Sequence, residues 1–256
     1  MPDSQCLSVV PSELNNLDDP LKQLNYRGDL SLLNLPKVSI VGARRAYPYS
    51  RNITHNLSLA LAKRNVCVVS GAAMGIDAIA HEAAYPKTIA VMANGLNVIY
   101  PKVNKKLITK MSESSLILSE YDDDFEGRAY TFVERNRIVV ALGEVLVIAQ
   151  ADLKSGSMRS AEFALEMGKK IYVLPHRLGE SEGTMKLLKE GKAELITDIN
   201  IFADKFGSFT EEKDEFLKFC KMNSSYEDVL SFNSQKLFEY ELLGKIKIIN
   251  AKVQVL

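Results

Sequence analysis

The sequence predicts an α/β fold: a Rossmann-like, doubly wound and mostly parallel sheet, followed by a small C-terminal winged-helix-like module. Between residues 37 and 206, short apolar runs alternate with segments whose apolar residues recur at helical spacing. Many of the runs are continuously apolar, as strands buried on both faces of a parallel sheet should be. Small-residue turns join several runs to the helix that follows, which favours helices packed on both faces of one sheet.

The elements of this domain follow one another along residues 37–206. Strands are expected near 38–42, 66–70, 88–93, 115–119, 145–149 and 171–175. Helices are expected near 49–64, 76–84, 103–112, 132–142, 157–168 and 183–191. The first helix illustrates the periodicity, because Ile53, Leu57 and Leu61 fall on one stripe. With 256 residues and 46% hydrophobic content, the chain is long enough to bury a sizeable core.

The two ends of the chain differ from this repeat. Residues 1–36 are polar and contain four prolines, so we expect an extension with one or two helical turns that lies on the main domain. Residues 207–213 are interpreted as a linker. Residues 214–256 carry helical patterns and end in an apolar hairpin pattern around Asn250, an order typical of a winged helix. Because residues 207–256 hold seven lysines and eight carboxylates, we favour a protein-contact role over DNA binding for this module.

Composition and charge exclude several classes of protein. The 32 basic residues balance 32 acidic residues, so any basic surface for nucleic acid must be local. The three cysteines are widely spaced and form no CxxC pair, which is typical of a reduced cytoplasmic protein without disulfides or structural zinc. Neither a signal peptide nor an apolar stretch of transmembrane length is evident. We therefore expect a cytoplasmic protein with no membrane insertion, no metal site and no cofactor.

One turn has the composition of a phosphate site. Lys154 stands directly before Ser155, Gly156 and Ser157, which open a helix after the apolar run 145–149. Unpaired N–H groups and the helix dipole favour an anion at such a helix start, and the lysine adds a full positive charge. Serine and glycine also occur in such turns simply as helix caps, so this turn alone is a weak signal.

The same arrangement follows two earlier strands. One strand ends at Gly42 and precedes Arg44 and Arg45, and another ends at Ser70 and Gly71. Turns that follow the strands of a parallel sheet lie along one edge, so the three turns are expected to share one crevice. Such a row suits a ligand with several phosphates, above all a nucleic-acid backbone. Close helix packing would explain the glycines, but it would not explain the basic residues.

Each residue type at these turns has an expected role. Arg44 is the main phosphate ligand, because a planar guanidinium reaches two oxygens at once. Arg45 is either a second ligand or a surface charge. Ser70 and Gly71 offer a hydroxyl and a backbone N–H to the same phosphates.

A stacking platform is expected further along the chain. Arg128 and Phe132 follow an acidic loop at 122–126. An exposed phenylalanine beside an arginine can stack a base, which is worth roughly 1–3 kcal/mol. The alternative is that Phe132 anchors the start of its helix in the core. Asn136, one turn later, either contacts the ligand or braces the crevice by hydrogen bonds to its turns.

Five motifs, in order over residues 38–193, resemble those of the DprA/Smf family. The matching residues are Ser70–Asp77 with Ala80 and His81; Gly95–Asn97 with Tyr100, Pro101 and Asn104; Leu118–Glu120 with Phe132–Arg137; Ser155–Ala161 with Gly168 and Val173–Pro175; and Gly183, Thr184, Leu187, Leu188 and Gly191. The resemblance implies a single-stranded-DNA-binding protein of natural transformation, which protects incoming strands and loads a RecA-type recombinase onto them. It also implies a homodimer with no catalytic residues, and a C-terminal winged-helix domain.

Five residues depart from the family pattern. Met74 stands where arginine is usual, Met185 where asparagine is usual and Val133 where proline is usual. His176 and Arg177 replace a usual glycine. Met74 is expected to lose or move one backbone contact, and Arg177 is a candidate for a compensating charge.

Two classes of enzyme are the alternatives to a binding protein. Nucleoside-monophosphate phosphoribohydrolases of the lysine-decarboxylase-like Rossmann group share a small-residue phosphate turn, but Ser160 occupies the place of their catalytic glutamate. A dinucleotide-dependent oxidoreductase would need a GxGxxG turn, whereas Gly42 is followed by Ala43, Arg44 and Arg45. The sequence therefore favours binding without catalysis.

Overall fold

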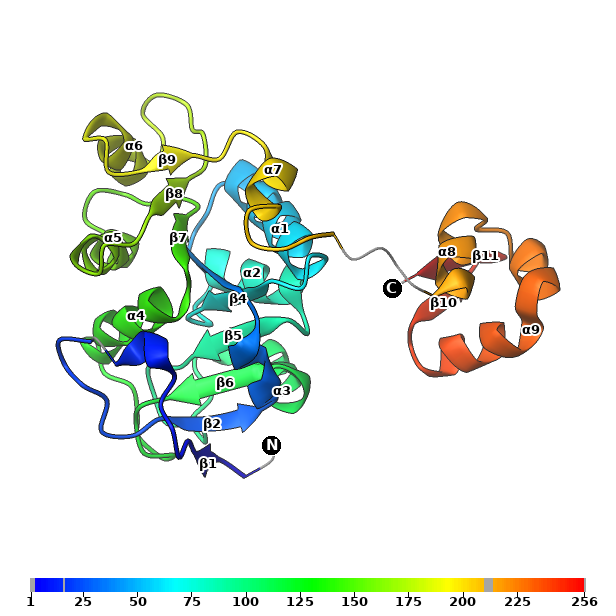
Figure 1. Ribbon diagram of the computed structural model, residues 1–256, viewed down its shortest axis with the longest axis horizontal. Helices are drawn as coiled ribbons and strands as arrows, with labels where there is room; N and C mark the ends of the chain where they lie inside the picture. The colour runs from blue at the N-terminus through cyan, green and yellow to red at the C-terminus, as the bar shows by residue number, and fades with distance from the viewer. Residues whose placement is uncertain (1–2, 16, 210–213, 256) are drawn as a thin grey trace. The chain divides into compact units, whose positions relative to one another are not determined.

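The computed structural model describes residues 3–15, 17–209 and 214–255 and divides the chain into two compact units, residues 1–209 and 210–256 (Figure 1). Residues 210–213 of the expected linker lie outside the described residues. Each unit is considered by itself below. Within the described ranges, no helix combines the length and apolarity needed to cross a bilayer.

The first unit is built on one sheet, whose described strands follow the order β1-β2-β6-β5-β4-β3-β7-β8-β9 (Figure 1). From β6 to β9 all neighbouring strands are parallel. Their bounds are β3 (Lys37–Val41), β4 (Cys67–Ser70), β5 (Thr88–Val91), β6 (Leu116–Ser119), β7 (Val145–Ile148), β8 (Ile171–Val173) and β9 (Glu194–Leu195). The expected doubly wound, mostly parallel sheet is confirmed.

Helices cover both faces of this sheet because successive strand residues point to opposite sides. In β4, Val68 packs with α1 (Pro48–Ala62), α2 (Ile76–Ala84) and α7 (Ile199–Ala203), whereas Val69 packs in the cluster on the other face. That second cluster contains residues of α4 (Thr131–Leu142), α5 (Gly156–Glu166) and α6 (Glu182–Lys189). A separate cluster places α3 (Lys105–Ser114) against β5 and β6.

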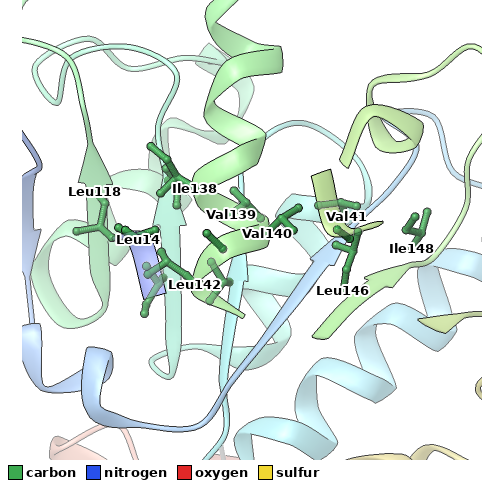
Figure 2. Packing of buried hydrophobic residues seen from close by; sticks show 14 of the residues in the cluster. Leu14, Val41, Leu118, Ile138, Val139, Val140, Leu142, Leu146 and Ile148 are labelled. Atoms are coloured by element: carbon green, nitrogen blue, oxygen red, sulfur yellow. The ribbon is translucent and has the colours of Figure 1, made fainter. Parts of the chain in front are cut away.

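Helix α4 lies across the core of the second face. Figure 2 shows Ile138, Val139, Val140 and Leu142 of α4 between Leu118 of β6 on one side and residues of β3 and β7 on the other. The C-terminal half of α4 is fully buried, so the helix is fixed in place. Its N-terminal turn is thereby held at the carboxyl edge of the sheet.

The N-terminal segment does more than lie on the domain, because its two strands extend the sheet. Strand β2 (Asn25–Gly28) pairs antiparallel with β6, and β1 (Gln5–Cys6) pairs antiparallel with β2. The expected helical turns are short 3₁₀ segments, Ser12–Leu14 and Leu30–Asn34. The strands were not predicted because Asn25–Gly28 has neither an apolar run nor a clear alternation.

Side chains of this segment also hold two loops. Asn25 donates to the Tyr121 carbonyl at 2.9 Å, and Gln23 donates to Asp122 at 2.7 Å. The buried Arg27 donates to the Leu96 carbonyl at 2.7 Å. The segment therefore ties the loop after β5 to the loop after β6.

The second unit has two helices followed by a β-hairpin. Helix α8 (Glu215–Met222) precedes α9 (Tyr226–Leu242), whose helical backbone is interrupted at Asn233. Strands β10 (Ile246–Ile249) and β11 (Lys252–Val255) pair around Asn250 and Ala251, both of which have positive φ as a two-residue type I′ turn requires. The hairpin at Asn250 is where it was expected, and the winged-helix assignment stays an interpretation.

Candidate nucleic-acid interface

A cavity of about 380 Å³ opens beyond the carboxyl ends of β4, β3 and β7, which are neighbours in the sheet. We call it the edge cavity. Its lining comes from the turns after β3 and β4 and from the first turns of α4 and α5, and includes Gly42–Arg44, Ala73, Asp77, Phe132, Val133, Arg135, Asn136, Ser155–Ser157 and Ser160. The expected sharing of one crevice by three turns is thus confirmed.

The start of α5 supplies the anion-binding groups of the edge cavity. Ser155 is the N-cap residue, yet its side chain does not cap the helix, so the first N–H groups are left to a ligand. The hydroxyls of Ser155 and Ser160 are buried without a hydrogen-bond partner among the described residues. Ser160 was not expected here, although it lies one helical turn after Gly156. Two unpaired hydroxyls beside a helix start suit the oxygens of a phosphate.

Arg44 and Phe132 also line a second, narrower cleft, which we call the aromatic cleft. Its other walls include Met74, Asn94 and Tyr100. The rings of Tyr100 and Phe132 lie 5.2 Å apart at a tilt of 58°. Phe132 is half-buried, so it is neither the fully buried core anchor nor a free surface ring, and its face borders both cavities.

Two buried side chains of opposite charge, Arg135 and Asp77, hold the backbone behind the two cavities. Arg135 donates to the carbonyls of Gly71, directly after β4, and of Val91, the last residue of β5. Asp77 accepts the N–H groups of Gly71 at 3.2 Å and Ala73 at 3.4 Å. Burial lowers the pKa of Arg135 to about 10, which leaves its guanidinium charged at neutral pH. The pair therefore fixes the turns on which the cavities depend.

Sequence reasoning did not single out this pair, although one signal pointed to it. Arg135 precedes Ile138 and Val139 by three and four positions, so helical spacing places it on the buried stripe of α4. A buried arginine needs acceptors and a nearby negative charge; the carbonyls of Gly71 and Val91 are the acceptors, and Asp77 in the first turn of α2 supplies the charge.

Two predicted phosphate contacts are wrong in their chemistry. The Ser70 side chain is fully buried, and its hydroxyl donates to the Ile40 carbonyl at 2.6 Å. The Gly71 N–H is taken by Asp77. A Cβ at Gly71 would lie 2.4 Å from the guanidinium of Arg135, so this glycine makes room for that side chain. Both residues hold the turn and do not offer groups to a ligand.

The other predicted residues divide into two groups. Asn136 lines the edge cavity and donates to the Gly156 carbonyl at 3.5 Å, which agrees with the bracing role. Arg45, Arg128 and Lys154 are exposed, and they lie outside the lining of the edge cavity and of the aromatic cleft. These three side chains can contribute positive field to the edge, but the structure does not place them as direct ligands of either cavity.

The comparisons with known proteins cover the unit that holds this site. The model of the DNA recombination-mediator protein A family matches residues 8–207. The chain belongs to this family. It is 37% identical over 192 residues to DNA processing protein DprA of Streptococcus pneumoniae, which covers 73% of this chain and 67% of that one. It is 36% identical to protein Smf of Escherichia coli, of which it spans 52%.

A solved relative has the same fold. The structure of DNA processing protein A from Helicobacter pylori superposes with a TM-score of 0.78 at 46% identity, and covers 79% of this chain and 94% of that one. That structure gives insight into the single-stranded DNA binding mode of the Helicobacter protein. The corresponding Streptococcus pneumoniae structure gives a TM-score of 0.74 at 33% identity, and covers 81% of this chain and 75% of that one.

Proposed function

We propose that this chain binds single-stranded DNA along the carboxyl edge of its sheet. The observation that carries the proposal is the position of Arg44, which lines both the edge cavity and the aromatic cleft. Arg44 therefore borders both the cavity at the uncapped start of α5 and the cleft at the Tyr100–Phe132 pair. Phosphate binding and base stacking can then occur on adjacent nucleotides of one strand.

The proposed contacts are of two kinds. Phosphate oxygens are bound by Arg44, Ser155, Gly156, Ser157 and Ser160. Phe132 stacks on the face of a base. Neither kind reads the hydrogen-bonding edge of a base, so little sequence preference is expected. A base can reach Phe132 only when it is unpaired, so single strands are preferred over duplex DNA.

The family supports a wider role for this binding. We infer that the protein acts in natural transformation, where it protects incoming strands and helps to load a RecA-type recombinase, as a homodimer and without a catalytic step of its own. Recombinase assembly on protein-coated oligonucleotides, followed with and without this chain, tests the loading step. Sedimentation at micromolar concentration tests the dimer, which a purely monomeric mass would contradict.

The second unit is proposed as a protein-contact module. Its exposed side chains include Phe232, Phe238 and Leu242, and the lysines and carboxylates of residues 207–256 nearly cancel. A surface without net positive charge holds DNA poorly. A chain ending at Phe209 should therefore retain single-strand affinity within a few-fold.

The salt dependence of binding tests the proposed function. If about three to five phosphates are neutralised per protomer, the logarithm of affinity should fall with the logarithm of salt at a slope of about −2 to −3.5. Affinity for a mixed-sequence single strand is then about 20- to 130-fold lower at 200 mM than at 50 mM salt. Fluorescence anisotropy with labelled oligonucleotides measures both values. Equal affinity for the matching duplex, or a flat salt response, contradicts the proposal.

Replacing Phe132 separates stacking from electrostatics. The Phe132→Ala variant should bind single strands about 5- to 150-fold more weakly, because one base stack is lost, and its salt slope should stay that of the unaltered protein. Phe132→Tyr keeps an aromatic face and serves as the control. A large loss of thermal stability, or a changed salt slope, would show that Phe132 supports the fold instead.

A further inference from the structure

A third cavity lies at the same edge of the sheet, between the start of α1 and the loop after β8. It has a volume of about 450 Å³ and is lined by Tyr47, Tyr49, His176, Arg177, Glu180 and two prolines. This volume falls within the range of sites that hold small organic molecules, about 300–1,000 Å³. We call it the tyrosine cavity. It shares no lining residue with the edge cavity.

The tyrosine cavity presents aromatic faces that are already held in place. Tyr47 and Tyr49 are 47% and 43% exposed, so large parts of both rings face solvent. The His176 ring meets Tyr49 edge-on with centroids 5.9 Å apart, and its Nε2 hydrogen bonds to the Ala149 carbonyl at 2.8 Å. Rings that are fixed before binding lose little freedom when a base stacks on them.

The two cavities share a wall. The turn after β3 lines the edge cavity at Arg44 and the tyrosine cavity at Tyr47, three residues later. This turn is bonded to the turn after β7, because Ala43 donates to the Gln150 carbonyl and Tyr47 donates to the Gln150 side chain, both at 2.9 Å. Three residues of extended chain span at most about 10 Å, which is about three nucleotides of a stacked strand.

The charges around the tyrosine cavity also suit a nucleic-acid strand. Arg177 is exposed in its lining, while Glu180 hydrogen bonds to the Arg177 backbone N–H at 3.4 Å within the same loop. Helix α1 begins at Pro48 without a side-chain cap, so its first N–H groups add positive potential beside the rings.

We propose that the tyrosine cavity is a second nucleotide-binding position for the same single strand, in which Tyr49 stacks a base and Arg177 binds a neighbouring phosphate. The proposal rests on single-strand binding at the edge cavity. A strand held there crosses the turn after β3 and enters the tyrosine cavity. The DNA strand then contacts a longer stretch of the protein surface than the edge cavity alone.

The test compares two lengths of oligothymidylate in anisotropy titrations. Tyr49→Ala combined with Arg177→Ala should weaken binding of a 20-mer about tenfold or more, since a stack and a phosphate contact are lost together, and should change binding of a 4-mer less than about twofold. The matched control removes Tyr85 and Lys170, which precede β5 and β8 at the opposite edge of the sheet. The conservative pair Tyr49→Phe and Arg177→Lys should bind like the unaltered protein.

The outcomes separate this proposal from the proposed function. If the unaltered protein binds neither oligonucleotide, the proposed function fails. Suppose that Arg44→Ala weakens binding of both oligonucleotides. If the combined Tyr49 and Arg177 variant then weakens binding of neither, or of both equally, binding at the edge cavity is supported and the second position is overturned. Photocrosslinking of a 5-iododeoxyuridine 20-mer to the unaltered protein should mark Tyr47 or Tyr49, and crosslinks confined to Tyr100 and Phe132 would contradict the proposal.

Discussion

Replacing Arg135 with methionine is expected to lower the free energy of unfolding by about 3–6 kcal/mol, because two hydrogen bonds from a charged group, worth about 1.5–3 kcal/mol each, are lost. The variant removes the donors to the carbonyls of Gly71 and Val91, and it takes away the positive charge that acts on the buried Asp77. Urea denaturation of the variant and of the unaltered protein measures the difference. Arg159→Met is the control, because Arg159 is an exposed arginine paired with Glu162 on α5 and should matter by less than about 1 kcal/mol.

The pH dependence of the Arg135 variant gives a second check. Burial already raises the pKa of Asp77 in the folded protein, and loss of the guanidinium raises it further. A carboxyl whose folded-state pKa is raised stabilises the fold below its unfolded value of about 3.9, and that stability is lost as pH rises through the folded value. The difference in the free energy of unfolding between the unaltered protein and the variant should therefore be smaller at pH 4 than at pH 7. An equal difference in the free energy of unfolding at both pH values, or no difference, would show that Arg135 and Asp77 do not stabilise the turns together.

Replacing Arg44 with alanine should weaken single-strand binding about 10- to 150-fold, because hydrogen bonds to a charged group are worth about 1.5–3 kcal/mol. Thermal stability should hardly change, since Arg44 is exposed. The salt slope should become shallower by about 0.7 for each phosphate released. Anisotropy titrations at several salt concentrations measure both effects.

Arg45→Ala is the matched control for Arg44. It removes an equal charge from the adjacent position, but Arg45 lines neither the edge cavity nor the aromatic cleft. Arg45→Ala should therefore weaken single-strand binding only slightly, through the loss of one unit of net charge. Equal losses for the two variants would mean that Arg44 acts through the general field of the edge and does not hold a phosphate.

The strand–helix alternation was open to prediction because it rests on local patterns. Strands β3 to β8 are mostly apolar, and the helices between them show 3.6-residue periodicity. Strand β2 was missed because its pairing with β6 is decided by partners about 90 residues away, and β1 in turn pairs only with β2. Short polar strands of this kind have no signal of their own in the sequence.

The sequence indicated which turns line the edge cavity, because that depends on their position along the sheet edge. It did not indicate which groups of those turns are already hydrogen bonded to distant parts of the chain. Arg44 and the start of α5 meet because the turns after parallel strands must share one edge. Ser70 and Gly71 are lost as ligands because acceptors in other elements, the Ile40 carbonyl and the Asp77 carboxylate, already take their hydrogen bonds. Sequence spacing identifies a turn with the right groups, but it does not show which of those groups the fold itself has taken.

The N-terminal segment has a consequence for the stacking surface that it never touches. Its side chains bond to the loop that precedes Tyr100 and to the loop that precedes Phe132, so the spacing of the two rings is set partly from residues 23–27. The segment thus joins two loops that each lead to one of the rings. If the two rings stack bases as proposed, substitutions at residues 23–27 should weaken base stacking although they replace none of the proposed DNA-binding residues.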